Sequence, residues 1–278
     1  PPGSGKSVLL NYLNTGLCME ESNIDLPYVR TIDVGKSSYG FTQLIKNALT
    51  EDKQYLVIAE RLRNVKEKAI NVFDTQLGCR TPLPTEENFL KRFFKIIMTN
   101  EDGSLSKAIE GLVDSLIPEM YYYYSDKQNP KKYAKGFSPL VDKAVLDIGM
   151  VIEDNKTTYW QIVDALFKAG RIREAKVAQT FAVPVLSDAA SVITQSTTLK
   201  EFYSIRKDAG DEGLIGEFKR KMKEVLEKYP MLNDITKIDF ANAKIVTLDL
   251  DETVKPGEIK NNSLIYMLGR YVLGKDFF

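Results

Sequence analysis

The sequence contains no histidine and only two cysteines among its 278 residues. The absence of histidine excludes a Ser-His-Asp triad, a Cys-His dyad, a histidine-ligated zinc site and a histidine proton shuttle. Cys18 and Cys79 are too few for a disulfide framework or a four-cysteine metal site. Such sparse use of cysteine is typical of a chain in a reducing compartment.

The sequence also lacks an excess of either charge, because 38 Lys and Arg balance 38 Asp and Glu. Proteins held on nucleic acid mainly by phosphate contacts usually carry a basic excess, so this balance disfavours that class while leaving room for a local basic groove. No apolar stretch approaches the roughly 18 residues of a membrane span, and the first residues lack the layout of a signal peptide. The 44% hydrophobic and 27% charged fractions are those of an ordinary globular protein.

The first ten residues, PPGSGKSVLL, contain most of a phosphate-binding loop of the pattern G-x-x-x-x-G-K-[ST]. The matching residues are Gly3, Ser4, Gly5, Lys6 and Ser7. Glycines let successive backbone N–H groups point at phosphates, Lys6 would reach the β and γ phosphates of ATP, and the Ser7 hydroxyl would bind Mg²⁺. The opening glycine would precede the first residue, so we expect the chain to be a fragment that begins inside the motif.

A helix has to begin at the lysine of such a loop, so that its positive end faces the phosphates. Apolar residues follow at helical spacing and predict this helix, with Gly16 as its end. They are Val8, Leu9, Tyr12 and Leu13.

A second GKS triplet lies at 35–37, but Arg30 occupies the place of the earlier glycine. The triplet follows a β-like run at 27–33, and we interpret 35–40 as the loop after that strand rather than as a second nucleotide site. Asp33 ends the strand at the edge where α/β folds place ligands. A solvated turn aspartate is the alternative interpretation.

The run 243–252, AKIVTLDLDE, is typical of a buried parallel strand that ends in acids. Charges at the end of a buried strand are costly unless they meet a metal or a donor. In a Walker B strand, an aspartate holds the Mg²⁺ shell and the next glutamate polarises the attacking water. We therefore assign Asp251 to the metal and Glu252 to the general base, a role that has to fall to a carboxylate here. Asp249 lies on the same face as Asp251 and is the rival metal ligand; an edge strand running into an acidic turn is the alternative.

More than 200 residues separate Lys6 from Asp251, whereas two βαβ units take roughly 60 to 80. Most of the interval therefore has to be an insertion, and its periodicity predicts helices at 86–98, 105–116, 140–152, 160–168, 173–181 and 211–229. A further helix at 263–273, with Ser263 as its N-cap, follows the acids. We expect the first part of the core at 1–84, an all-helical insertion at 85–235 and the second part of the core at 236–278, with the core incomplete at both ends.

The segment 71–84 is predicted as a short strand that leaves the core into a loop. Arg80 within it is a candidate for a nucleotide contact, because an arginine stabilises the transferring phosphoryl group in many such enzymes. An ordinary ion pair or a helix-end role is the other interpretation of Arg80.

Six blocks carry a resemblance to a known family: PPGSGKSVLLN, IDVGKSSYG, NVFDTQLGCR, AQTFAVPVL, IVTLDLDE and IYMLGRYVLGKDFF. The blocks follow one another along almost the whole chain. In this order they resemble the IcmB/DotO-type ATPases of Dot/Icm (type IVB) secretion systems. These ATPases belong to the wider family of conjugation and type IV secretion P-loop ATPases. The loop and acid motifs are common to many NTPases, whereas the blocks between them are specific.

The resemblance implies an α/β core of RecA/HerA type with a large all-helical insertion. It implies a hexamer that binds ATP and Mg²⁺ between subunits, with an arginine of one subunit reaching its neighbour's nucleotide. Gly5, Lys6 and Ser7 take the Walker A roles, and Asp251 and Glu252 take the Walker B roles. The location would be the bacterial cytoplasm, peripheral to the inner membrane, with another secretion ATPase and inner-membrane channel subunits as partners and no nucleic acid.

The chain departs from the family pattern because it lacks the opening glycine and offers two candidate metal aspartates. The fragment alone is therefore expected to bind nucleotide weakly or not to hydrolyse it. Two other functions fit the motifs: a DNA-translocating motor of the same superfamily, and a structural secretion subunit whose nucleotide site only controls assembly. A small-molecule kinase fits less well, because the long insertion and the Asp-Glu pair favour water as the nucleophile.

Overall fold

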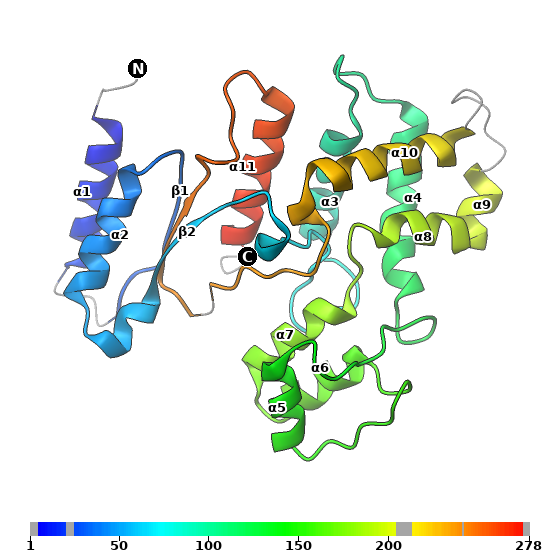
Figure 1. Cartoon of the computed structure of the whole chain (residues 1–278), viewed down its shortest axis with the longest axis horizontal. Coiled ribbons are helices and arrows are strands. Elements are labelled where there is room, and N and C mark those ends of the chain that lie inside the picture. Colours follow the sequence, from blue (N-terminus) through cyan, green and yellow to red (C-terminus); the bar gives the residue numbers. More distant parts are fainter. Residues whose placement is uncertain (1–4, 21–24, 204–212, 241, 275–278) are drawn as a thin grey trace. The chain divides into compact units, whose positions relative to one another are not determined.

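The computed structural model of the protein describes residues 5–20, 25–203, 213–240 and 242–274 (Figure 1). The chain forms two compact units: unit 1 consists of residues 1–64 and 238–278, and unit 2 consists of residues 65–237. Unit 2 is thus inserted between the two halves of unit 1. The boundaries expected from the sequence lie at 84/85 and 235/236, whereas residues 65–84 group with the helices rather than with the sheet.

Unit 1 is built on a parallel sheet of three strands in the order β1-β3-β2. Its elements are α1 (Lys6–Cys18), β1 (Val29–Asp33), α2 (Ser37–Ala48), the 3₁₀ helix η1 (Glu51–Leu56), β2 (Val57–Arg61), β3 (Ile245–Asp249) and α11 (Ile259–Gly274). The α/β class and the buried strand before the acids are thereby confirmed. The strand expected at 27–33 is confirmed as β1, and the loop after it is shorter than expected, because α2 begins at Ser37.

The two faces of β3 carry different helices, because successive strand side chains point in opposite directions. On one face, Ile245 packs with Phe41 and Ile45 of α2, and Thr247 forms a buried 2.7 Å hydrogen bond with Thr42. On the other face, Leu248 lies against α11, where a Cβ added to Gly269 would be 3.5 Å from its side chain. The sheet is therefore covered on both sides, as a parallel sheet requires.

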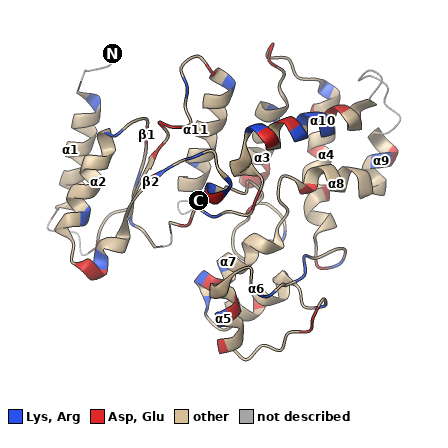
Figure 2. Ribbon diagram, in the orientation of Figure 1, with Lys and Arg blue, Asp and Glu red and all other residues tan. Residues whose placement is uncertain are grey.

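Helix α1 begins at Lys6, as expected, but it runs past Gly16 to Cys18 and has no buried residue. The helix predicted from Val8, Leu9, Tyr12 and Leu13 is confirmed, and these four side chains are all exposed. The reason is that α2 already covers this side of the sheet, so α1 packs on α2 instead. Figure 2 shows α1 as an almost uncharged helix with a single basic residue at its start.

Helix α11 begins at Ile259, so Ser263 lies inside it and its expected role as N-cap is wrong. Two asparagines in the first turn hold the preceding loop and allow the earlier start. Asn261 Nδ2 donates to the Thr253 carbonyl at 2.8 Å, and Asn262 both accepts from the Lys255 N–H and donates to its carbonyl.

Apart from one isolated antiparallel bridge between Lys132 and Thr158, the regular elements in the described residues of unit 2 are helices joined by loops. Its helices are η2 (Lys66–Lys68), α3 (Pro84–Met98), α4 (Lys107–Tyr123), α5 (Pro139–Asp147), α6 (Tyr159–Lys168), α7 (Ile172–Ala182), α8 (Asp188–Gln195), α9 (Thr197–Tyr203), α10 (Gly213–Lys228) and η3 (Pro230–Leu232). The six expected helices correspond to α3 to α7 and α10, and 211–212 lie outside the described residues. In the described part of the chain, no helix combines the length and apolarity that crossing a bilayer requires.

The strand expected at 71–84 is wrong, because this segment consists of turns held by side chains. The buried Gln179 of α7 accepts a 2.7 Å hydrogen bond from the Gly78 N–H, and its amide donates to the carbonyls of Thr75 and Gln76. A side chain of the helical unit thus satisfies backbone groups that a strand would pair with a neighbour.

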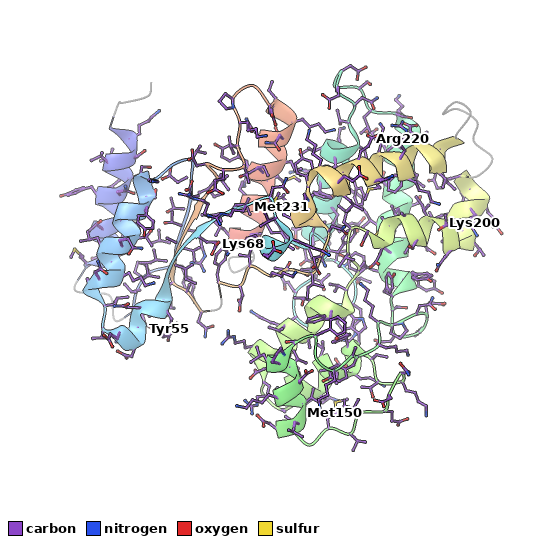
Figure 3. All side chains as sticks on the ribbon, viewed as in Figure 1. Tyr55, Lys68, Met150, Lys200, Arg220 and Met231 are labelled. Atoms are coloured by element: carbon purple, nitrogen blue, oxygen red, sulfur yellow. The ribbon has the colours of Figure 1, made fainter. Side chains whose placement is uncertain are left out.

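The two ends of unit 2 lie side by side. The Ile70 N–H donates to the Met231 carbonyl at 2.8 Å, and the Lys237 N–H donates to the Ala69 carbonyl at 2.9 Å. Lys68 and Met231, labelled in Figure 3, mark the two neighbouring segments. The first and last residues of unit 2 are therefore neighbours in space. Unit 2 also has its own aromatic core, which includes Phe73, Phe94 and Phe218.

The close approach of α11 to the sheet predicts a size limit at position 269. Gly269→Leu is expected to lower the free energy of unfolding of unit 1 by about 1–3 kcal/mol, because the added atoms overfill the contact with Ile32, Leu248 and Leu250. Gly269→Ala is the matched control and is expected to be neutral or stabilising, since its Cβ would be in ordinary contact and alanine favours a helix. Urea unfolding checks both variants, and equal stability of Gly269→Leu and wild type would contradict the packing described.

Candidate functional site

The carboxyl ends of the three strands bring Asp33, Asp249 and Arg61 to one level. Asp33 of β1 pairs in register with Asp249 of β3, and Arg61 of β2 pairs with Asp249 from the other side. Each is the last residue of its strand. This edge is where α/β sheets bind ligands, and it is formed by parts of the chain almost 190 residues apart.

Asp249 is the centre of this edge, with 13% of its side chain exposed. Its Oδ2 accepts from Arg61 Nε at 3.0 Å, and its Oδ1 accepts from the N–H groups of Gly35 at 3.1 Å and Asp251 at 3.0 Å. A largely buried carboxylate needs such partners. Asp249 thereby ties the loop after β1, the end of β2 and the turn after β3 together.

Glu252 is held by two arginines. Its Oε1 accepts from Arg61 Nη1 at 2.9 Å, and its Oε2 lies 3.0 Å from Arg63 Nε. The hydrogen bond from Arg61, with the charge of Arg63, holds the pKa of the Glu252 carboxyl below its usual value. The hydrogen bonds that Arg61 donates to Glu252 and Asp249 raise the pKa of Arg61. Glu252 is therefore ionised and paired at neutral pH.

Asp251 lies in the turn after β3 and is exposed. In the described part of the chain its carboxylate has no hydrogen-bond partner, in contrast to that of Asp249. No cluster of three or more acidic or thiol side chains suited to a metal occurs among the described residues. Mg²⁺ is usually held by one or two carboxylates together with phosphates and water, so a single exposed aspartate fits this metal.

Asp33 caps the start of α2. Its Oδ2 accepts from the Ser37 hydroxyl at 2.6 Å and the Ser38 N–H at 2.7 Å, and its Oδ1 accepts from the Val34 N–H at 2.9 Å. Partial burial acts to raise the pKa of Asp33, but these hydrogen bonds outweigh it and the net pKa is lowered. The 35–37 triplet thus forms a loop and helix start organised around this carboxylate.

The residues expected to form a Walker A loop lie at the start of α1. Gly5 is its N-cap in the left-handed conformation, with φ of 75°, which favours glycine. Lys6 and Ser7 form the exposed first turn, whereas Gly3 and Ser4 lie outside the described residues. Asn11 Nδ2 donates to the Ser37 carbonyl at 2.8 Å and joins α1 to the start of α2.

Arg80 belongs to unit 2, where each of its three guanidinium nitrogens donates a hydrogen bond. It donates to Asp164 at 2.7 Å and to Asp126 at 3.2 Å, and it lies 4.5 Å from the centre of the Trp160 ring. The ordinary ion pair, which the sequence left open as an alternative to a nucleotide contact, is what the structure contains.

Sequence reasoning missed Arg61 and Arg63. The signal was present, because the run VIAERLR at 57–63 is apolar at its start and places arginines two residues apart at its end. Their significance depends on the pairing of this strand with β3, which local pattern does not reveal.

The cap on α2 predicts a pH-dependent stability. Asp33→Asn is expected to lower the free energy of unfolding by about 1 kcal/mol at pH 7, because charged acceptors of backbone N–H groups stabilise a helix start. The pKa of Asp33 is lower in the folded than in the unfolded chain. Its charge therefore stabilises the fold fully above about pH 4, and this contribution is lost as the pH falls through the folded pKa.

Urea unfolding of wild type and Asp33→Asn between pH 7 and pH 2 measures this effect. The difference in the free energy of unfolding between wild type and Asp33→Asn should become smaller below about pH 4. Asp52→Asn, at an exposed aspartate of η1, is the control and should follow the wild type. A gap that stays constant over the whole range would contradict the role of the Asp33 charge.

Comparison with known proteins finds no matching family model, no matching curated protein and no matching solved structure.

Proposed function

We propose that this chain is an ATP-binding and hydrolysing motor subunit that energises substrate export or assembly in a bacterial type IV secretion system. The observation that carries the proposal is the acidic end of β3. It lies at the carboxyl edge of a parallel sheet, in the same unit as α1, which has Gly5 as its N-cap and begins with Lys6 and Ser7.

The arrangement of α1 supports a role of Lys6 at this edge. The N-terminal ends of α1 and α2 lie at the same end of unit 1 (Figure 1), and Asn11 is bonded to the first residue of α2. Because an α-helix rises 1.5 Å per residue, Lys6 extends about 8 Å beyond the level of that contact. The positive end of α1 therefore points in the direction that phosphate binding would require, while α1 itself packs on α2 rather than on the sheet.

In the proposed reaction, the Gly5 backbone and the Lys6 amine hold the β and γ phosphates of ATP. The Ser7 hydroxyl and the Asp251 carboxylate would hold Mg²⁺, which supplies charge neutralisation on the phosphates. Glu252 orients water and accepts its proton, since no histidine exists to do so. Asp249 is the weaker candidate for the metal, because three donors already occupy its oxygens.

The proposal extends to assembly and location, for which the support is the ordered resemblance of the six sequence blocks. Unit 1 would be part of a RecA/HerA-like core, and a hexamer would bind ATP between subunits, with an arginine from the neighbour completing the site. The partners would be another secretion ATPase and inner-membrane channel subunits. The location would be the bacterial cytoplasm, peripheral to the inner membrane.

The two GKS triplets provide a matched pair for testing the site. Lys6→Ala in the purified protein is expected to weaken Mg-ATP binding at least about tenfold, because it removes a charge-assisted contact to the phosphates. Lys36→Ala makes the same change at the second triplet and is expected to leave the affinity unchanged. Calorimetric titration with Mg-ATP measures both, and a loss confined to Lys36→Ala would overturn the assignment.

Glu252→Gln separates chemistry from binding. In the assembled secretion ATPase, hydrolysis is expected to fall at least about 100-fold, because the amide cannot accept a proton from water, while Mg-ATP binding persists. Glu258→Gln is the control, at an exposed glutamate six positions along the chain. Phosphate release and secretion are measured together: if secretion persists after turnover vanishes, the motor function is wrong and a structural role in assembly replaces it.

A further inference from the structure

Both carboxylate oxygens of Glu252 are engaged by arginines, although the proposed function gives Glu252 the task of accepting a proton from water. Arg61 Nη1 lies 2.9 Å from Oε1, and Arg63 Nε lies 3.0 Å from Oε2. Each oxygen of Glu252 thus already has a guanidinium partner before any water or nucleotide approaches.

The two arginines differ in how firmly they are fixed. Arg61 ends β2 in register with Asp249, bridges Asp249 and Glu252, and is 35% exposed. Arg63 lies beyond the end of the strand, is 54% exposed and has Glu252 as its ion-pair partner among the described residues. Arg61 is thus part of the frame of the sheet edge, whereas Arg63 can leave Glu252 without disturbing that frame.

A nucleotide at this edge would compete with Glu252 for Arg63. An exposed single ion pair contributes little to stability, because water screens it. Guanidinium groups bind phosphate oxygens with strong, directional hydrogen bonds. The edge also carries the carboxylates of Asp33, Asp249 and Asp251, so a polyphosphate arriving there requires every available cation.

We propose that Arg63 is a further nucleotide-binding residue that changes partner. It pairs with Glu252 when no nucleotide is bound, and it contacts a phosphate oxygen of ATP when nucleotide is present. This inference depends on the proposed ATP site. Its consequence is that Glu252 regains one free oxygen only when ATP has arrived, so the carboxylate becomes accessible to water only after the substrate binds.

A cycle of Mg-ATP affinities tests the exchange. Arg63→Gln is expected to weaken Mg-ATP binding about tenfold, and to leave the affinity for AMP, which lacks the outer phosphates, unchanged. Glu252→Gln removes the competitor and is expected to tighten Mg-ATP binding severalfold in the wild-type background. The increase in Mg-ATP affinity caused by Glu252→Gln should be smaller when Arg63 is also replaced by Gln, because Glu252→Gln acts by freeing Arg63.

The control is Arg270→Gln, at an exposed arginine near the end of α11, which is expected to bind like the wild type. Arg63→Lys keeps the charge and is expected to recover part of the affinity; it replaces Arg63→Gln if circular dichroism shows that the latter does not fold. Equal Mg-ATP affinities of Arg63→Gln and wild type, or the same gain from Glu252→Gln in both backgrounds, would overturn the proposal for Arg63 alone. If neither wild type nor Arg270→Gln binds Mg-ATP, the ATP site itself fails.

Discussion

The pairing of β3 between β1 and β2 is the constraint on which the rest of unit 1 depends. Hydrogen bonding in parallel register brings Asp33, Asp249 and Arg61 to one level, although Asp249 is more than 180 residues away from the other two along the chain. The same register turns Ile245 and Thr247 toward α2, and Leu248 toward α11. A slip of one residue would exchange these faces and separate the acids from the arginine.

Asp249 shows how the stability of this edge and its chemistry are linked. Its nearly buried charge is acceptable because three donors surround it, and one of these donors, Arg61, also holds Glu252. The contact that makes the buried acid tolerable therefore lowers the basicity of its neighbour. A site of this kind is stable without ligand, and a change of partners is needed before Glu252 can accept a proton.

In its described residues, unit 2 pairs several of its charges and backbone groups internally. Its two ends meet at Ala69 and Lys237, its core contains the Phe73, Phe94 and Phe218 rings, and Arg80 is held by Asp126 and Asp164. An insertion with its own core and closely spaced ends adds little constraint to the strands that it separates. This is the physical reason why β2 and β3 can pair across it.

The local sequence pattern was sufficient to predict the elements that depend mainly on neighbouring residues. The apolar run before Asp249 determined a buried strand, the GKS residues determined a helix start at Lys6, and periodicity determined most helices of the insertion. The composition alone showed that this chain has no histidine to activate water, so we assign this task to a carboxylate.

Only the tertiary structure decided which of these elements meet. It placed Arg61 and Arg63 on Glu252, left the apolar side chains of α1 exposed because α2 occupies the sheet, and made the segment 71–84 a set of turns around Gln179. Each of these outcomes depends on contacts between residues distant along the chain. Propensity and spacing describe a residue's near neighbours, whereas burial and ion pairing are set by whatever the fold brings alongside.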